Sequence, residues 1–280
     1  GATLYNDTQM FLSEQPTLDE RLRRTQLITH ETAHMWFGDY VTMDWFNDVW
    51  TKEVFANYFA ARITEPLFPE VNHALNSIKN YTASALSEDR TAGTNAIRQQ
   101  LDNLRNAGLI YGNIIYNKAP VMMNKLVEIM GEEAFREGIH EYLTTFAYGN
   151  ATWDDLIAIL DARSDEDLKG FSEVWVNRKG MPHIAFAEHE GVLEIVQRDP
   201  LERSLVWPQR FAITFVGDGW ERVEEVDLSV ERVTMPIPEG TQLILPNTDG
   251  RGYGLFIPTV ETMAWLLAHW HEGGDDTARQ

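Results

Sequence analysis

Cysteine is absent from this 280-residue chain, and so is any long run of apolar residues. Without a thiol, the chain has no disulfide, no cysteine nucleophile and no cysteine-ligated metal site. A cysteine-free sequence is compatible with either a cytoplasmic or a periplasmic location, so the compartment stays unknown. Because no stretch of about eighteen apolar residues occurs, the sequence predicts no membrane span.

Positive charge is also scarce. The sequence has 23 lysine and arginine residues against 43 aspartate and glutamate residues, which gives a formal net charge of −20 at pH 7. A surface with this excess of negative charge repels phosphate backbones, so we expect no nucleic-acid partner. The apolar fraction of 44% is enough for a sizeable core, and the length predicts two domains or one domain with appendages. The oligomeric state does not follow from composition.

The most informative motif is HETAH at residues 30–34, which is followed by Glu53 in the run WTKEVFANYFA. A helix places His30 and His34 on one face, where they can bind one metal ion together. Glu53, on a second helix, supplies a third ligand and leaves a fourth position for water, which is typical of a catalytic zinc site. We therefore predict one zinc ion held by His30, His34 and Glu53.

The HExxH motif alone is weak evidence for a metal site, because it arises by chance in roughly one chain in a hundred of this length. The flanking sequence must therefore be considered as well. The alternative is two histidines and a glutamate on a solvated helix face. Thr17 and Glu20 form a capping-box pattern that starts a helix predicted over residues 18–37. A second helix is predicted over residues 48–63, and Asn57 on that helix can support a ligand. These flanks favour the metal site.

The same residues support a hydrolytic mechanism. Zinc lowers the pKa of its bound water from 15.7 toward ~7, which makes a nucleophile available at neutral pH. Glu31 points about 100° around the helix from His30, so it is poorly placed to bind the same ion. It can instead act as the general base that accepts the water's proton and passes it to the leaving amine. Hydrolysis of a peptide bond is therefore the predicted reaction.

Residues 30–59, HETAHMWFGDYVTMDWFNDVWTKEVFANYF, closely resemble the zinc core of the aminopeptidase N-like peptidases. These gluzincin aminopeptidases are zinc metallopeptidases and include the leukotriene hydrolases. The segment IIYNKAPVMM at residues 114–123 is similar to the family segment that carries a catalytic tyrosine, and Tyr116 is the matching position. The segments VWVNRKGMPHI and GYGLF resemble the borders of the family's β-sandwich domain.

The resemblance implies a zinc-dependent aminopeptidase with a peptide substrate. Tyr116 would then donate a hydrogen bond to the oxyanion that forms from the attacked carbonyl. Three alternatives stay open: an endopeptidase, an epoxide or ester hydrolase on the same scaffold, and an inactive relative that serves as a binding module. The aromatic residues around the zinc segment are expected to be mainly core: Trp36, Phe37, Trp45, Phe46 and Trp50.

Two departures from the family pattern stand out. The exopeptidase signature Gly-x-Met-Glu-Asn, which precedes the HExxH helix in the family, does not occur in this sequence. Lys52 and Val54 flank Glu53 where many relatives have asparagine and glycine. We therefore expect a fragment of a longer enzyme, without the exopeptidase motif and the C-terminal helical domain, that is weakly active or inactive alone.

The predicted fold class is multidomain α+β. We predict a mainly helical, thermolysin-like catalytic domain over residues 1–180 with its N-terminal part missing, a small antiparallel β-sandwich over 181–258, and the start of a truncated helical domain over 259–280. Further helices are predicted over 70–86, 96–104, 113–130, 132–146, 154–163, 168–178 and 260–270. Strands are predicted over 183–188, 193–198, 209–216, 221–228, 231–235 and 242–244.

Overall fold

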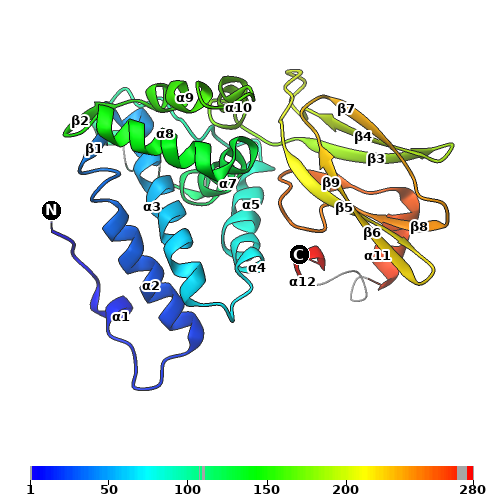
Figure 1. The fold of residues 1–280 in the computed structure, drawn as a ribbon, viewed down its shortest axis with the longest axis horizontal. Coiled ribbons are helices and arrows are strands. Elements are labelled where there is room, and N and C mark those ends of the chain that lie inside the picture. Colours follow the sequence, from blue (N-terminus) through cyan, green and yellow to red (C-terminus); the bar gives the residue numbers. More distant parts are fainter. Residues whose placement is uncertain (1, 107, 109–110, 270–275, 280) are drawn as a thin grey trace. The chain divides into compact units, whose positions relative to one another are not determined.

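The computed structural model describes residues 2–106, 108, 111–269 and 276–279. The chain divides into two compact units. Unit 1 combines Gly1–His73 with Ile97–Ser172, and unit 2 combines Ala74–Ala96 with Glu173–Gln280. Helices and sheets occur together, which confirms the α+β class (Figure 1). The domain boundaries near residues 180 and 258 stay a prediction.

Two helices form the centre of unit 1. Helix α2, Leu18–Ala33, packs against α3, Val49–Thr64, and the two lie side by side (Figure 1). Around them lie α7 (Ala119–Met130), α8 (Glu132–Thr145) and α9 (Trp153–Asp161). A short parallel ladder joins β1 (Val41–Met43) to β2 (Gly149–Ala151), which the sequence did not indicate. Further short elements are α1 (Asp7–Met10), η1 (Phe46–Asp48) and η2 (Glu65–Leu67).

The start of α2 follows from its capping box, as predicted. Thr17 Oγ1 accepts from the Glu20 backbone N–H at 3.2 Å, while Glu20 Oε2 accepts from the Thr17 N–H at 2.8 Å. The predicted end at Phe37 is wrong, because the α-helix ends at Ala33 and His34 is its C-cap. The chain then turns tightly and reaches Gly38, which has a φ of 130°. Glycine adopts this backbone conformation readily, whereas other residues would be strained there.

Two stretches of the chain differ from their predicted helices. The helix expected over 96–104 is wrong, since residues 97–101 are irregular and only the 3-10 turn η4, Leu104–Asn106, follows. Tertiary hydrogen bonds hold this segment: Leu101 N–H donates to Asn47 Oδ1 at 2.6 Å, and Trp45 Nε1–H donates to the Leu101 carbonyl at 2.7 Å. The helix expected over 113–130 begins as a π-helix, η5 (Ile114–Lys118), and continues as α7.

Unit 2 contains the helical stretch that follows His73. The helix predicted over 70–86 is divided into α4 (His73–Ser77), the π-helix η3 (Ile78–Thr82) and α5 (Ala83–Asp89). The sequence did not indicate that this stretch would pack with the C-terminal part. Unit 2 resumes at Glu173, within helix α10 (Leu168–Trp175), and α11 (Val260–His269) packs against a strand edge. The predicted last residue of α11, Trp270, lies outside the described residues; α12 is Asp276–Arg279.

The strands of unit 2 form two sheets that share one core. The strands are β3 (His183–His189), β4 (Val192–Arg198), β5 (Arg210–Gly217), β6 (Trp220–Asp227), β7 (Arg232–Pro236), β8 (Thr241–Leu245) and β9 (Leu255–Ile257). The orders are β7-β4-β3-β9 and β6-β5-β8. Ile184, Ile195, Phe211 and Phe215, drawn from both sheets, belong to a single buried cluster. The expected antiparallel sandwich needs one correction, because β9 pairs with β3 in parallel.

None of the helices in the described residues combines the length and the apolarity that crossing a bilayer requires.

Candidate metal centre

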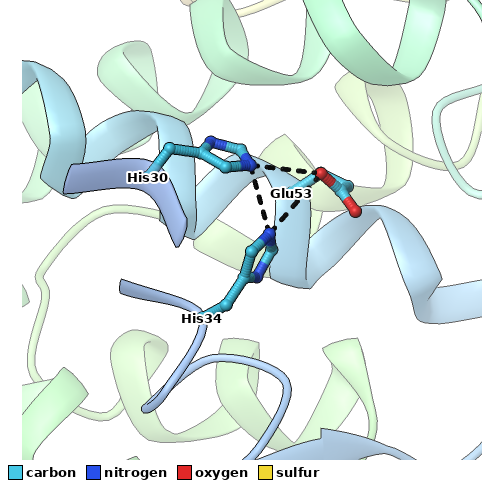
Figure 2. Close-up of side chains that lie close together, drawn as sticks. All are labelled: His30, His34 and Glu53. Carbon is cyan, nitrogen blue, oxygen red and sulfur yellow. Dashed lines mark hydrogen bonds and ion pairs between the residues drawn. The ribbon is translucent and has the colours of Figure 1, made fainter. Parts of the chain in front are cut away.

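Three side chains of unit 1 converge at the end of α2. His30 lies in the last turn of α2, His34 caps that helix, and Glu53 lies in the first half of α3. The two Nε2 atoms are 3.1 Å apart, and Glu53 Oε2 is 3.5 Å from His30 Nε2 and 3.8 Å from His34 Nε2 (Figure 2). The three potential donor atoms thus surround one point between the helices.

The hydrogen bonds of the outer imidazole nitrogens define which nitrogen can bind a metal. His34 Nδ1 lies 3.1 Å from the Phe37 carbonyl oxygen. A carbonyl only accepts, so Nδ1 carries the proton and Nε2 of the neutral ring keeps a lone pair. His30 Nδ1 lies 2.9 Å from Asn57 Oδ1, which assigns the same tautomer to His30. Both Nε2 lone pairs therefore face the Glu53 carboxylate.

This cluster fits a cation. Two imidazole lone pairs and a carboxylate oxygen are all acceptors, and they repel one another unless positive charge lies between them. A tetrahedral zinc ion with ligand bonds of 2.0–2.1 Å separates its ligand atoms by about 3.3 Å. The observed separations of 3.1, 3.5 and 3.8 Å lie around that value. Within the described residues, His30, His34 and Glu53 form the one group of three metal-ligating side chains whose ligand atoms all lie within 4.8 Å of one another.

Glu53 is the buried member of the cluster, with 7% of the residue exposed. Burial raises the pKa of this carboxyl, whereas the positive charge of Lys52 and its contact with the carboxylate lower the pKa. Lys52 Nζ lies 3.2 Å from Glu53 Oε1, the oxygen that does not face the imidazoles. Glu53 is therefore an anion at neutral pH, which is the form that binds metals.

A cleft of about 340 Å³ opens beside the cluster. Glu31, His34 and Lys52 line it, together with Met35 and Thr42. Glu31 is half-buried and, within the described part of the chain, makes no hydrogen bond or ion pair. Its carboxylate is therefore available to a molecule in the cleft.

Tyr116 lies in the π-helix η5 and is 39% exposed. Its ring stacks against Tyr111 with the ring centroids 6.0 Å apart. Burial, followed by the negative charge of Glu53 and by Tyr111, raises the pKa of the Tyr116 hydroxyl to about 12. The hydroxyl is therefore protonated at neutral pH, and it is close enough to Glu53 for the carboxylate charge to act on it.

Sequence reasoning missed two parts of this arrangement. The Phe37 carbonyl orients His34, and a backbone group at a helix end leaves no signal in residue type. Lys52 stood out only as a departure from the family pattern, and its position next to Glu53 gave no direct indication of the ion pair. Asn57, in contrast, could be selected from its spacing of one helical turn after Glu53.

Two histidines and one carboxylate beside an open cleft are typical of mononuclear metallohydrolases. The profile of the peptidase family M1 domain matches residues 1–175. The chain therefore belongs to peptidase family M1, whose members are generally zinc-dependent metallopeptidases. This match confirms the resemblance to the aminopeptidase N-like peptidases.

Curated relatives with aminopeptidase names agree with the family match. The chain is 29% identical to probable aminopeptidase 1 of Sulfurisphaera tokodaii, over 71% of this chain and 25% of that protein. It is 30% identical to the alanine/arginine aminopeptidase of Saccharomyces cerevisiae, over 70% of this chain and 23% of that protein. Human endoplasmic reticulum aminopeptidase 2 is 26% identical over 95% of this chain and 31% of its own length. The chain thus spans about a quarter to a third of these relatives.

Proposed function

We propose that this chain carries the zinc centre of an aminopeptidase, which removes residues from the N-terminus of peptides. Family membership and the aminopeptidase names of the relatives support the reaction class. The observation that carries the metal is the convergence of two imidazole lone pairs and the Glu53 carboxylate. His30, His34 and Glu53 would hold the zinc ion.

Each residue around the centre has a separate task in this proposal. When bound, zinc supplies a Lewis acid that acidifies water and polarises the scissile carbonyl. Glu31 accepts a proton from the attacking water and delivers it to the amine nitrogen as the peptide C–N bond breaks. The protonated hydroxyl of Tyr116 donates a hydrogen bond to the oxygen of the former carbonyl, where negative charge develops.

The fold proposal is that the helices of residues 1–180 form a thermolysin-like catalytic domain. The family profile ends at residue 175, close before the first strand of the two sheets at His183, which supports a boundary there. Residues 181–258 would form the β-sandwich, and residues 259–280 the beginning of a helical domain.

Metal content tests the ligand set directly. After dialysis against zinc and removal of the excess, we expect close to one zinc ion per chain in the parent and much less in Glu53→Ala. Glu31→Gln should retain the zinc ion while losing about 10²- to 10⁴-fold in hydrolysis rate, because only the proton transfer is removed. Undiminished hydrolysis by Glu31→Gln would contradict the mechanism.

Substrate pairs separate the aminopeptidase from its alternatives. A fluorogenic peptide with a free N-terminus should be cleaved, and the same peptide with an acetylated N-terminus should not. Cleavage of the acetylated peptide would indicate an endopeptidase. Hydrolysis of an ester or epoxide, with neither peptide cleaved, would indicate the hydrolase alternative. Zinc binding without any hydrolysis by the full-length enzyme would indicate a binding module.

A further inference from the structure

The two oxygens of Glu53 have different partners. Oε2 faces the imidazoles at 3.5 and 3.8 Å, while Oε1 lies 3.2 Å from Lys52 Nζ. Figure 2 shows the same division, because the dashed lines from His30 and His34 meet one oxygen and the other points away. The carboxylate is thus held with a single oxygen directed at the proposed metal position.

This orientation matters for a metal site that must bind substrate. A carboxylate can donate one oxygen or both to a metal ion. If both Glu53 oxygens bound, the protein would supply four donor atoms instead of three, and less room would remain for water and a peptide carbonyl. An ammonium group on Oε1 competes with the metal for that oxygen, since it is a compact positive charge with three N–H donors.

The local burial makes the contact between Lys52 and Glu53 effective. The side chain of Glu53 is 9% exposed and that of Lys52 is 31% exposed, so water screens this ion pair less than one on an open surface. Lys52 also lines the cleft with Glu31 and His34, so this residue borders the space through which substrate would approach.

We propose that Lys52 is a positioning residue, which restricts Glu53 to one metal-donor oxygen and so keeps the site three-coordinate in protein atoms. This inference rests on the proposed function, because it requires a metal ion at His30, His34 and Glu53. Lys52 acts through Glu53 and takes no part in proton transfer.

Substitution with cobalt(II) tests how many Glu53 oxygens bind the metal, and it needs no activity measurement. The visible absorption of cobalt(II) is strong in a four-coordinate site and weaker when the coordination number rises. We would prepare the 280-residue chain, Lys52→Met and Lys52→Gln as cobalt forms, and record spectra at equal cobalt content. Arg62→Met is the matched control, because Arg62 is a cation on the same helix whose exposed ion pair, at 2.8 Å, is with Glu132.

The parent and Arg62→Met should show the strong four-coordinate spectrum. Lys52→Met should lose about half or more of that absorption per cobalt ion, because Oε1 becomes free to bind. Lys52→Gln should change in the same direction, and it serves as the test if the methionine variant does not fold. Far-ultraviolet circular dichroism and a cobalt content of one per chain would establish that the variants are intact.

Two other results have distinct meanings. Unchanged spectra in both Lys52 variants would overturn the role of Lys52 and leave the proposed metal site standing. A parent chain that binds no cobalt, or binds it equally well after Glu53→Ala, would overturn the proposed metal site and the role of Lys52 together.

Discussion

Replacing Asn57 with alanine should weaken zinc binding about 10- to 100-fold and leave the fold intact. Asn57 lies one helical turn after Glu53 on α3, and its Oδ1 is 2.9 Å from His30 Nδ1. This hydrogen bond keeps the proton on Nδ1 and directs the Nε2 lone pair toward Glu53. Without this hydrogen bond, the His30 ring can rotate and its other tautomer becomes accessible. Zinc binding must then fix one rotamer and one tautomer of the ring, which lowers the affinity.

The magnitude follows from two contributions. A hydrogen bond in a half-buried position contributes about 0.5–1.5 kcal/mol net, and fixing one side chain on binding costs about 0.5–1.5 kcal/mol. Their sum is about 1–3 kcal/mol, and each 1.4 kcal/mol changes an equilibrium constant about tenfold. His34 offers no equivalent test, because its Nδ1 bonds to the Phe37 carbonyl, which no side-chain substitution removes.

The assay is competition for zinc between the chain and a chromogenic chelator, with thermal melting to confirm folding. Asn57→Asp should bind zinc within a few-fold of the parent or more tightly, since a carboxylate oxygen at the same place also accepts from Nδ1. Tyr58→Phe is the control from the next position of α3, where the ring packs against Phe59 and Phe135. Zinc affinity in a folded Asn57→Ala within about twofold of the parent would refute the reasoning.

Three further predictions concern the oxyanion and the fold. Tyr116→Phe should lower kcat about 10²- to 10³-fold at unchanged zinc content, measured on a peptide substrate, because one donor to the developing negative charge is lost. Arg98→Met should destabilise the chain by about 3–5 kcal/mol in denaturant unfolding, because Asp48, which is 3% exposed, loses the cation that pairs with it; an unchanged midpoint would contradict this. Burial raises the pKa of Asp199, but hydrogen bonds from the side chain and backbone of Arg203 lower it further, so the net pKa is below its ordinary value. The stabilisation by Asp199 is therefore complete above the unfolded-state pKa of about 3.9 and is lost as pH falls through the folded-state pKa. The difference in melting temperature between the parent and Asp199→Asn should accordingly close on acidification, and a constant difference would contradict the sign.

Local sequence signals were sufficient where local interactions decide the structure. The capping box at Thr17 starts its helix as the spacing to Glu20 predicts, and α9 begins with the same motif at Thr152. Six of the strands of unit 2 appear within one or two residues of their predicted ends, whereas β9 was not predicted as a strand. The HETAH spacing also predicted that His30 and His34 would lie together, although their role as metal ligands stays a prediction.

Tertiary contacts decided the positions that the sequence did not predict. Asp48 is the N-cap residue of α3, yet its side chain makes no capping bond. It accepts instead from Arg98 and from the backbone of Trp153, which lie 50 and 105 residues away along the chain. Among the aromatic residues expected to be core, Trp50 is buried, whereas Trp36 and Trp45 are 49% and 41% exposed. The residue type of an aromatic side chain does not by itself predict whether that side chain points into the core or toward solvent.

The π-helix that carries Tyr116 ends just before a proline, and a 3.6-residue pattern does not show this wider turn. In an α-helix, the N–H of residue 120 would bond to the Tyr116 carbonyl, but Pro120 has no N–H. The wider turn begins just before this gap, where the Ala119 N–H bonds to the Ile114 carbonyl, five residues back. One extra residue in the turn rotates the side chains before Pro120 relative to those of α7. A uniform helical wheel drawn through residues 113–130 would therefore misplace the Tyr116 hydroxyl.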